Sequence, residues 1–225
     1  FFDSMYLIFV LFLGIRILLL RKPKSCLVGA MTLLLVLGDS IQLIPRIVAQ
    51  ATVDGFEVNA AGLFLGTRIS AMTMSLFYLL FYYYIRREMK KTNRTLDVLM
   101  PVLFLIRIVT VILSFNRAAS MDLISNGPFV LMGIIDIALL YRERANTNFG
   151  KLYIYVFFSF LFYVPVVLFK NTFPTIGMLM MPKTVMYLLI VWKLYGNLKG
   201  EFNINDLLQF AMAYLFYGIF SGAFY

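Results

Sequence analysis

Ionisable side chains lie inside several of the longest apolar stretches of this sequence. The stretch "LGDSIQLIPRIV", residues 37–48, places Asp39, Gln42 and Arg46 at spacings of three and four residues, which brings them to one face of an α-helix. Four more such side chains occur in other apolar stretches, namely Arg68, Arg107, Asp136 and Lys183. Carboxylate and cationic groups in such surroundings could bind a charged ligand, exchange protons or pair with one another.

The composition places these side chains in a membrane. The chain is 62% hydrophobic and 14% charged, with a mean hydropathy of +0.87. Its apolar stretches are long enough to cross about 30 Å of hydrocarbon. The sequence therefore predicts an all-α, multi-pass membrane protein, with a single transmembrane domain over residues 1–225. We expect no cleavable signal peptide before the first apolar stretch.

Seven transmembrane helices are predicted, and an eighth is left open. The predicted spans are residues 4–20, 26–49, 59–85, 96–115, 127–141, 151–169 and 174–192. The eighth candidate, residues 207–225, either crosses the membrane or lies in its interface, and its length favours a crossing. Because the connections are short, we expect neighbouring helices to pack antiparallel, with no soluble domain inserted.

The distribution of Lys and Arg predicts the orientation of the bundle. Thirteen basic residues fall in the odd-numbered connections: Arg21, Lys22, Lys24, Arg86, Arg87, Lys90, Lys91, Arg94, Arg142, Arg144, Lys151, Lys193 and Lys199. The even-numbered connections carry two, Arg117 and Lys170. Basic loops stay on the cytoplasmic side of a plasma membrane, so the N-terminus is predicted outside. The net charge of +9 then suits the anionic inner leaflet, and we expect no nucleic-acid partner.

The position of each ionisable group along its predicted span indicates that these groups lie at similar depths in the membrane. At a rise of about 1.5 Å per residue, all of them fall in the middle or outer half of the membrane. Each charge facing lipid would cost at least ~2.5–3.5 kcal/mol, and the cations outnumber the carboxylates. We therefore expect an outward-facing, water-filled cavity that binds a small anionic or zwitterionic ligand or a lipid head group, in a transporter or receptor. The candidate ligand-binding residues are Asp39, Gln42, Arg46, Arg68, Arg107, Asp136 and Lys183.

Within this set, the residue types suggest separate roles. Arg68, Arg107 and Lys183 would bind the anionic group, while Asp39 and Asp136 would orient these cations or accept a proton. The alternative is purely structural, because Asp–Arg pairs also fix helix packing. We expect no cofactor and no metal site, since the chain has no His and one Cys; protein partners are not indicated.

Two further patterns carry expectations about the helices. Pro45, Pro165 and Pro182 lie in apolar stretches, and each would free the backbone carbonyl four residues earlier. The run "LFYLLFYYYIRR", residues 76–87, is typical of an aromatic belt at a membrane interface.

Several segments resemble an uncharacterised family of bacterial seven-span membrane proteins. The likeness rests on "GDSIQLIPRI", "SAMTMSLFYLLFYY" and "IGMLMMPKTVMYLLIVWKLY" and covers most of residues 5–195. It implies a bacterial plasma (inner) membrane but no activity, and that family has a histidine where Gln42 stands. The pair Gly38-Asp39 with a later Asp136 also resembles the lysoplasmalogenase family of membrane hydrolases. That likeness implies an alternative, a hydrolase in which Asp39 and Asp136 are catalytic.

Overall fold

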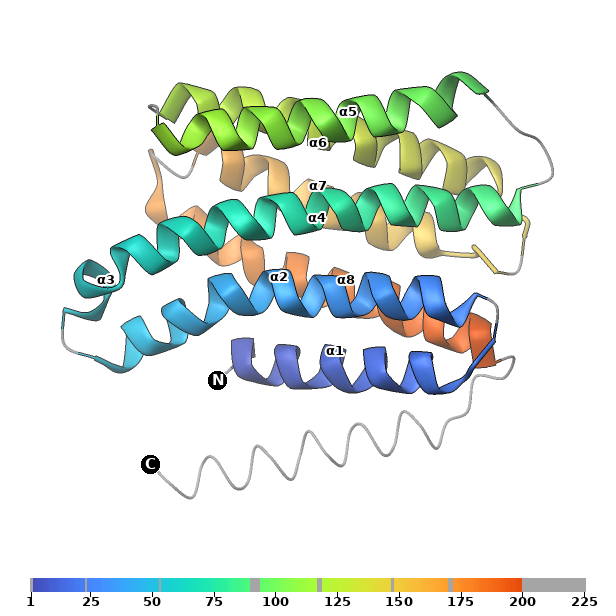
Figure 1. The fold of residues 1–225 in the computed structure, drawn as a ribbon, viewed down its shortest axis with the longest axis horizontal. Helices are drawn as coiled ribbons and strands as arrows, with labels where there is room; N and C mark the ends of the chain where they lie inside the picture. Colours follow the sequence, from blue (N-terminus) through green and yellow to red (C-terminus); the bar gives the residue numbers. More distant parts are fainter. Residues whose placement is uncertain are drawn as a thin grey trace.

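The protein is a bundle of antiparallel helices (Figure 1). The computed structural model describes residues 2–22, 24–52, 54–89, 94–116, 119–146, 148–169 and 172–199. Its helices are α1 (Phe2–Leu19), α2 (Ser25–Ala51), α3 (Gly55–Val58), α4 (Ala60–Glu88), α5 (Arg94–Leu113), α6 (Ala119–Arg142), α7 (Leu152–Phe169) and α8 (Met180–Lys199). Short 3-10 helices follow α5 (η1, Ser114–Asn116) and precede α8 (η2, Pro174–Leu179). No strand occurs in these ranges.

Six of the helices, α2 and α4 to α8, are long and apolar enough to cross a membrane. They indicate a multi-pass integral membrane protein, as the composition predicts. The 18-residue helix α1 packs against α2 and α8. The candidate eighth span, residues 207–225, lies outside the described residues.

Two helices begin elsewhere than predicted. Helix α6 starts at Ala119, eight residues before the predicted 127, and continues through "SNGP" with Pro128 inside it. Ser125 is buried in this first part. Helix α8 starts at Met180 and runs to Lys199, beyond the predicted end at 192.

The prolines differ in their effect on the helices. Pro45 lies inside α2 and Pro165 inside α7, where each removes a helical hydrogen bond. Pro182 lies near the start of α8, which follows the 3-10 helix η2 without a break. The Met178 carbonyl that Pro182 would free therefore lies in η2 and not in α8.

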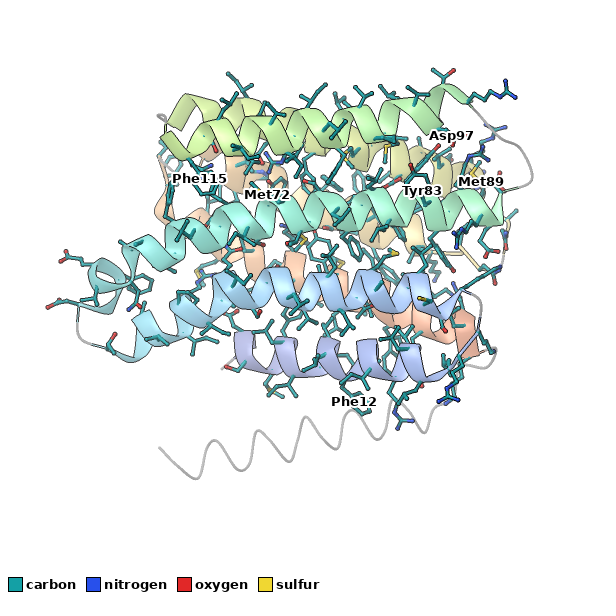
Figure 2. The ribbon with its side chains drawn as sticks, viewed as in Figure 1. Phe12, Met72, Tyr83, Met89, Asp97 and Phe115 are labelled. Atoms are coloured by element: carbon teal, nitrogen blue, oxygen red, sulfur yellow. The ribbon has the colours of Figure 1, made fainter. Side chains whose placement is uncertain are left out.

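The aromatic run of α4 forms the core of the bundle and not an interfacial belt. Phe77, Tyr78, Phe81 and Tyr82 are fully buried. The rings of the first three pack against one another, and the ring of Tyr78 also packs against rings of α6, α7 and α8. Tyr83 is the exposed aromatic residue of this stretch (Figure 2). Helix α4 contacts α2, α5 and α6, so its aromatic faces are covered by protein.

Polar contacts hold the end of the bundle that carries the basic connections. Asp97, at the start of α5, faces the last turns of α4 (Figure 2). It accepts hydrogen bonds from Arg86 Nε and Nη2, both at 2.7 Å, and from the Tyr82 hydroxyl at 2.7 Å. Lys24 and Glu88 form a further ion pair between the start of α2 and the end of α4. These contacts hold the ends of α2, α4 and α5 together at this end of the bundle.

Candidate functional site

Asp39 is held by hydrogen bonds from two other helices. Its carboxylate accepts a hydrogen bond from the Tyr6 hydroxyl of α1 at 2.8 Å and one from the Ser70 hydroxyl of α4 at 3.2 Å. The side chain is buried, with 7% of its surface exposed. Hydrogen bonds of this kind offset the cost of removing a carboxylate from water.

Close approach of α2 and α4 makes the contact with Ser70 possible. A Cβ atom on Gly66 would lie 2.6 Å from the Ile41 carbonyl oxygen, the carbonyl that Pro45 frees. One turn further along α4, Ser70 then reaches Asp39. The glycine and the proline therefore fix the local geometry around Asp39.

Lys183 of α8 lies between Asp39 and two aromatic rings. Asp39 of α2 is near enough to attract its ammonium, although the two groups do not meet in an ion pair in the described part of the chain. Its Nζ atom also lies 4.3 Å from the ring centre of Tyr163 and 5.3 Å from that of Tyr187. Ring faces attract cations, so Lys183 is held in a buried position by one carboxylate and two rings.

Arg107 of α5 is the second buried cation in this region. Its Nη2 atom donates a hydrogen bond to the Asn126 amide oxygen of α6 at 2.9 Å, and its guanidinium carbon lies 5.6 Å from the ring centre of Phe129. The Tyr163 hydroxyl donates to the same Asn126 oxygen. Arg107 and Lys183 are close enough to interact as like charges, and both are buried.

These contacts form one connected group, which we term the buried polar chain. It consists of Asp39 (α2), Lys183 (α8), Tyr163 (α7), Asn126 (α6) and Arg107 (α5). Five helices that are distant in sequence therefore direct polar side chains to one level of the bundle. Of the seven predicted site residues, the structure brings three together here.

Arg68, Gln42 and Arg46 lie outside this chain. Arg68 is half-buried on α4, where its Nη2 atom donates to the Ser114 backbone carbonyl at 3.4 Å and its guanidinium carbon lies 5.0 Å from the ring centre of Phe64. Gln42 and Arg46 are half-buried on α2, one and two turns beyond Asp39. All three residues lie on the α3 side of Asp39 and Ser70 along α2 and α4.

Asp136 lies at a different level from the buried polar chain. It follows Asn126 by ten residues on α6, or about 15 Å along the helix axis. Within α6, which runs from Ala119 to Arg142, Asp136 lies closer to the Arg142 end, and its depth in the membrane stays a prediction. Its carboxyl is fully buried and interacts with Tyr78 of α4, and no interaction with Arg107 or Lys183 is seen among the described residues.

Sequence reasoning missed four residues of this region. Tyr6 and Ser70 are common residues in membrane helices, and Tyr163 lies in a run of aromatic residues. Asn126 falls before the predicted start of its span, although an Asn within an apolar helix is itself a signal of interhelical hydrogen bonding. The sequence does not show which face of each helix points inward, and the structure is needed to place Tyr6, Ser70 and Tyr163 in the site.

Comparisons with protein-family models, with curated proteins and with solved structures find no match to this chain. Within the described ranges, no three His, Cys, Asp or Glu side chains gather to hold a metal ion. The geometry of the site defines a buried polar group that contains two cations and lies inside a bundle of apolar helices.

Proposed function

We propose that this chain crosses the membrane at least seven times, with α1 as the first span, the N-terminus outside and the basic connections in the cytoplasm of a bacterial cell. The apolar character of α1 and its packing against α2 and α8 support the seventh span. The alternation of basic and non-basic connections along the sequence supports the orientation.

We further propose that the buried polar chain binds the anionic group of a small molecule or of a lipid head group. Arg107 and Lys183 supply the positive charge. Asp39 orients Lys183 and offers a carboxylate to the positive end of a zwitterion. Arg68, Gln42 and Arg46 lie on the approach to this group and would guide the ligand towards it. The protein would act as a transporter or receptor for that ligand.

The observation that carries the proposal is the proximity of two buried cations. Arg107 and Lys183 repel one another, yet five helices direct polar side chains to the level at which they lie. A guanidinium keeps its charge at any physiological pH and binds carboxylates and phosphates through paired N–H donors. An anion between the two cations would turn their repulsion into attraction, while the aromatic faces of Tyr163 and Phe129 keep water away.

Binding can be measured on the full chain in lipid nanodiscs. We expect inorganic phosphate, or nanodiscs containing phosphatidylglycerol in place of phosphatidylcholine, to raise the thermal unfolding temperature. A response to phosphate indicates a soluble anion, whereas a response only to phosphatidylglycerol indicates a lipid head group. Native mass spectrometry of the purified protein would identify any molecule that remains bound.

The variant Arg107→Gln with Lys183→Met should abolish this response. The matched control Arg142→Gln, which removes an exposed cation at the end of α6, should keep it. Equal responses from both variants, or none from the unmodified protein, would contradict the proposal. Asp39→Asn separates binding from hydrolysis, because a hydrolase would lose turnover and keep its ligand.

A further inference from the structure

In the described part of the chain, the carboxyl group of Asp136 has no hydrogen-bond partner that could stabilise a negative charge. The side chain is fully buried, and neither carboxyl oxygen accepts a hydrogen bond among the described residues. Within the same residues, no cation interacts with it. This differs from Asp39, which accepts two hydrogen bonds and faces Lys183.

Among the described residues, the helices packed against α6 provide hydroxyl groups but no counter-charge at this level. Helix α4 contributes Tyr78, which interacts with Asp136. Helix α7 carries no Asp, Glu, Lys or Arg between Leu152 and Phe169. On α5, Asp97 binds Arg86, and Arg107 binds Asn126 one level further out.

An ionised carboxylate in these surroundings would be strongly unfavourable. Burial of an isolated charge in an apolar interior costs far more than burial of a neutral polar group, and such groups neutralise instead. Proton uptake achieves this by forming one O–H bond on either carboxyl oxygen, and release returns that proton to water. Intramembrane carboxyls without a structural partner are typical of proton pathways.

We propose that Asp136 is a proton-binding site, separate from the anion site and neutral in the described arrangement of helices. Hydroxyl groups lie between its level and the buried polar chain. Ser159 lies one turn below Tyr163 on α7, and Tyr187 lies one turn below Lys183 on α8. Both interact with Tyr78, although the hydroxyls of Tyr78 and Ser159 do not meet in hydrogen-bond geometry. A small rotation of these side chains would give a proton a route between the two levels.

Carbodiimide labelling tests this site directly on the full chain. Dicyclohexylcarbodiimide is apolar and reacts with protonated carboxyls to leave a stable N-acylurea adduct. We expect peptide mass spectrometry to find this adduct on Asp136, with loss of labelling as the pH rises. The control carboxyl is Asp97, which is also in a helix but is bound by Arg86, and it should stay unlabelled.

Infrared difference spectroscopy covers the case in which the reagent does not reach the residue. A protonated carboxyl gives a C=O band that shifts in heavy water, and Asp136→Asn should remove that band. Asn is neutral and similar in shape to the protonated acid, so this variant should keep the unfolding temperature of the parent protein. Absence of both the adduct and the band would overturn the proposal.

Sodium provides the competing explanation, since a monovalent cation would also neutralise the carboxylate. Replacement of choline by sodium at constant ionic strength should leave the labelling of Asp136 unchanged. If sodium instead prevents labelling, Asp136 binds sodium and the proposal of a proton site is overturned. The labelling of Asp136 also tests the proton site separately from the proposed anion site. Arg107→Gln with Lys183→Met should leave labelling of Asp136 intact even if no anion binds.

Discussion

At the scale of single residues, the buried charges of this protein differ in how they are stabilised. Asp39 has two hydroxyl donors and an ammonium group, whereas Asp136 has no hydrogen-bond donor in the described part of the chain. Removal of a group that stabilises a buried charge is unfavourable, because the charge is left less compensated. The two carboxyls should therefore respond in opposite ways to neutralisation.

We predict that Asp39→Asn and Lys183→Met are coupled. Each single change leaves one buried charge without its partner and should lower the unfolding temperature. The loss of unfolding free energy in the double variant should be smaller than the sum of the two single losses. We expect this difference, the coupling, to be on the order of 0.5–3 kcal/mol. Thermal unfolding of the four proteins in one detergent measures this.

A control pair separates this contact from general damage to the fold. Asp39→Asn combined with Arg142→Gln should be additive within about 0.5 kcal/mol, as is usual for distant residues. Strict additivity of Asp39→Asn with Lys183→Met would contradict the electrostatic contact between α2 and α8.

At the scale of helices, close backbone approach fixes the registers on which the site depends. Helices α2 and α4 meet where Gly66 faces the backbone of Ile41 and Gln42. The carbonyl freed by Pro45 thus faces a glycine, where a Cα–H group can approach an oxygen. Because Asp39 and Ser70 flank this crossing, a shift of either helix would separate them.

We predict that Gly66→Ala destabilises the bundle. Its Cβ would lie 2.6 Å from the Ile41 carbonyl oxygen and 2.7 Å from the Gln42 Cα atom, and backbone atoms cannot move aside without shifting a helix. Overpacking of this kind typically costs about 1–3 kcal/mol, and the unfolding temperature should fall.

The matched control for this change is Gly127→Ala, also within a helix, where an added Cβ meets nothing within 4 Å. It should leave the unfolding temperature unchanged or raise it, since Ala favours a helix over Gly. Equal effects at both glycines would show that the crossing of α2 and α4 is not tightly packed.

We also predict that Asp97→Asn loosens α5 from α4. The carboxylate accepts two hydrogen bonds from Arg86 and one from Tyr82, and an amide cannot accept the paired guanidinium donors in the same way. The unfolding temperature should fall, and hydrogen exchange should increase at the start of α5. Asp54→Asn, in the short connection before α3, serves as the control and should have no effect. Unchanged exchange in Asp97→Asn would show that this ion pair does not hold the helix end.

At the scale of the whole molecule, the bundle has two ends of different character. The connections after α1, α4 and α6 lie at one end, and those after α2, α5 and α7 lie at the other (Figure 1). The anion site that we propose belongs to the second end, which is the end with few basic residues.

We predict that the two ends label from opposite sides of the membrane. In a Cys26→Ser background, which removes the single cysteine, Asp54→Cys should react with a membrane-impermeant maleimide in intact cells. Arg144→Cys should react only after the cells are opened. The reverse pattern would invert the orientation and place the anion site on the cytoplasmic side.

The sequence alone determined the class of protein and most of the helices. Apolar length and charge act on each segment separately, because every residue in hydrocarbon must avoid exposing charges and backbone polar groups to lipid. Helical character over 4–20, 26–49, 96–115 and 151–169 therefore follows from local sequence, and Asp39, Arg107 and Lys183 stand out by their type.

Only the tertiary structure decided which side chains meet. Helix α6 extends back to Ala119, and the arrangement of α5 and α6 brings Asn126 to Arg107. The burial of the aromatic run of α4 has the same origin. Rotation and register of helices arise from contacts between segments distant in the chain, and hydropathy within one segment carries no information about them.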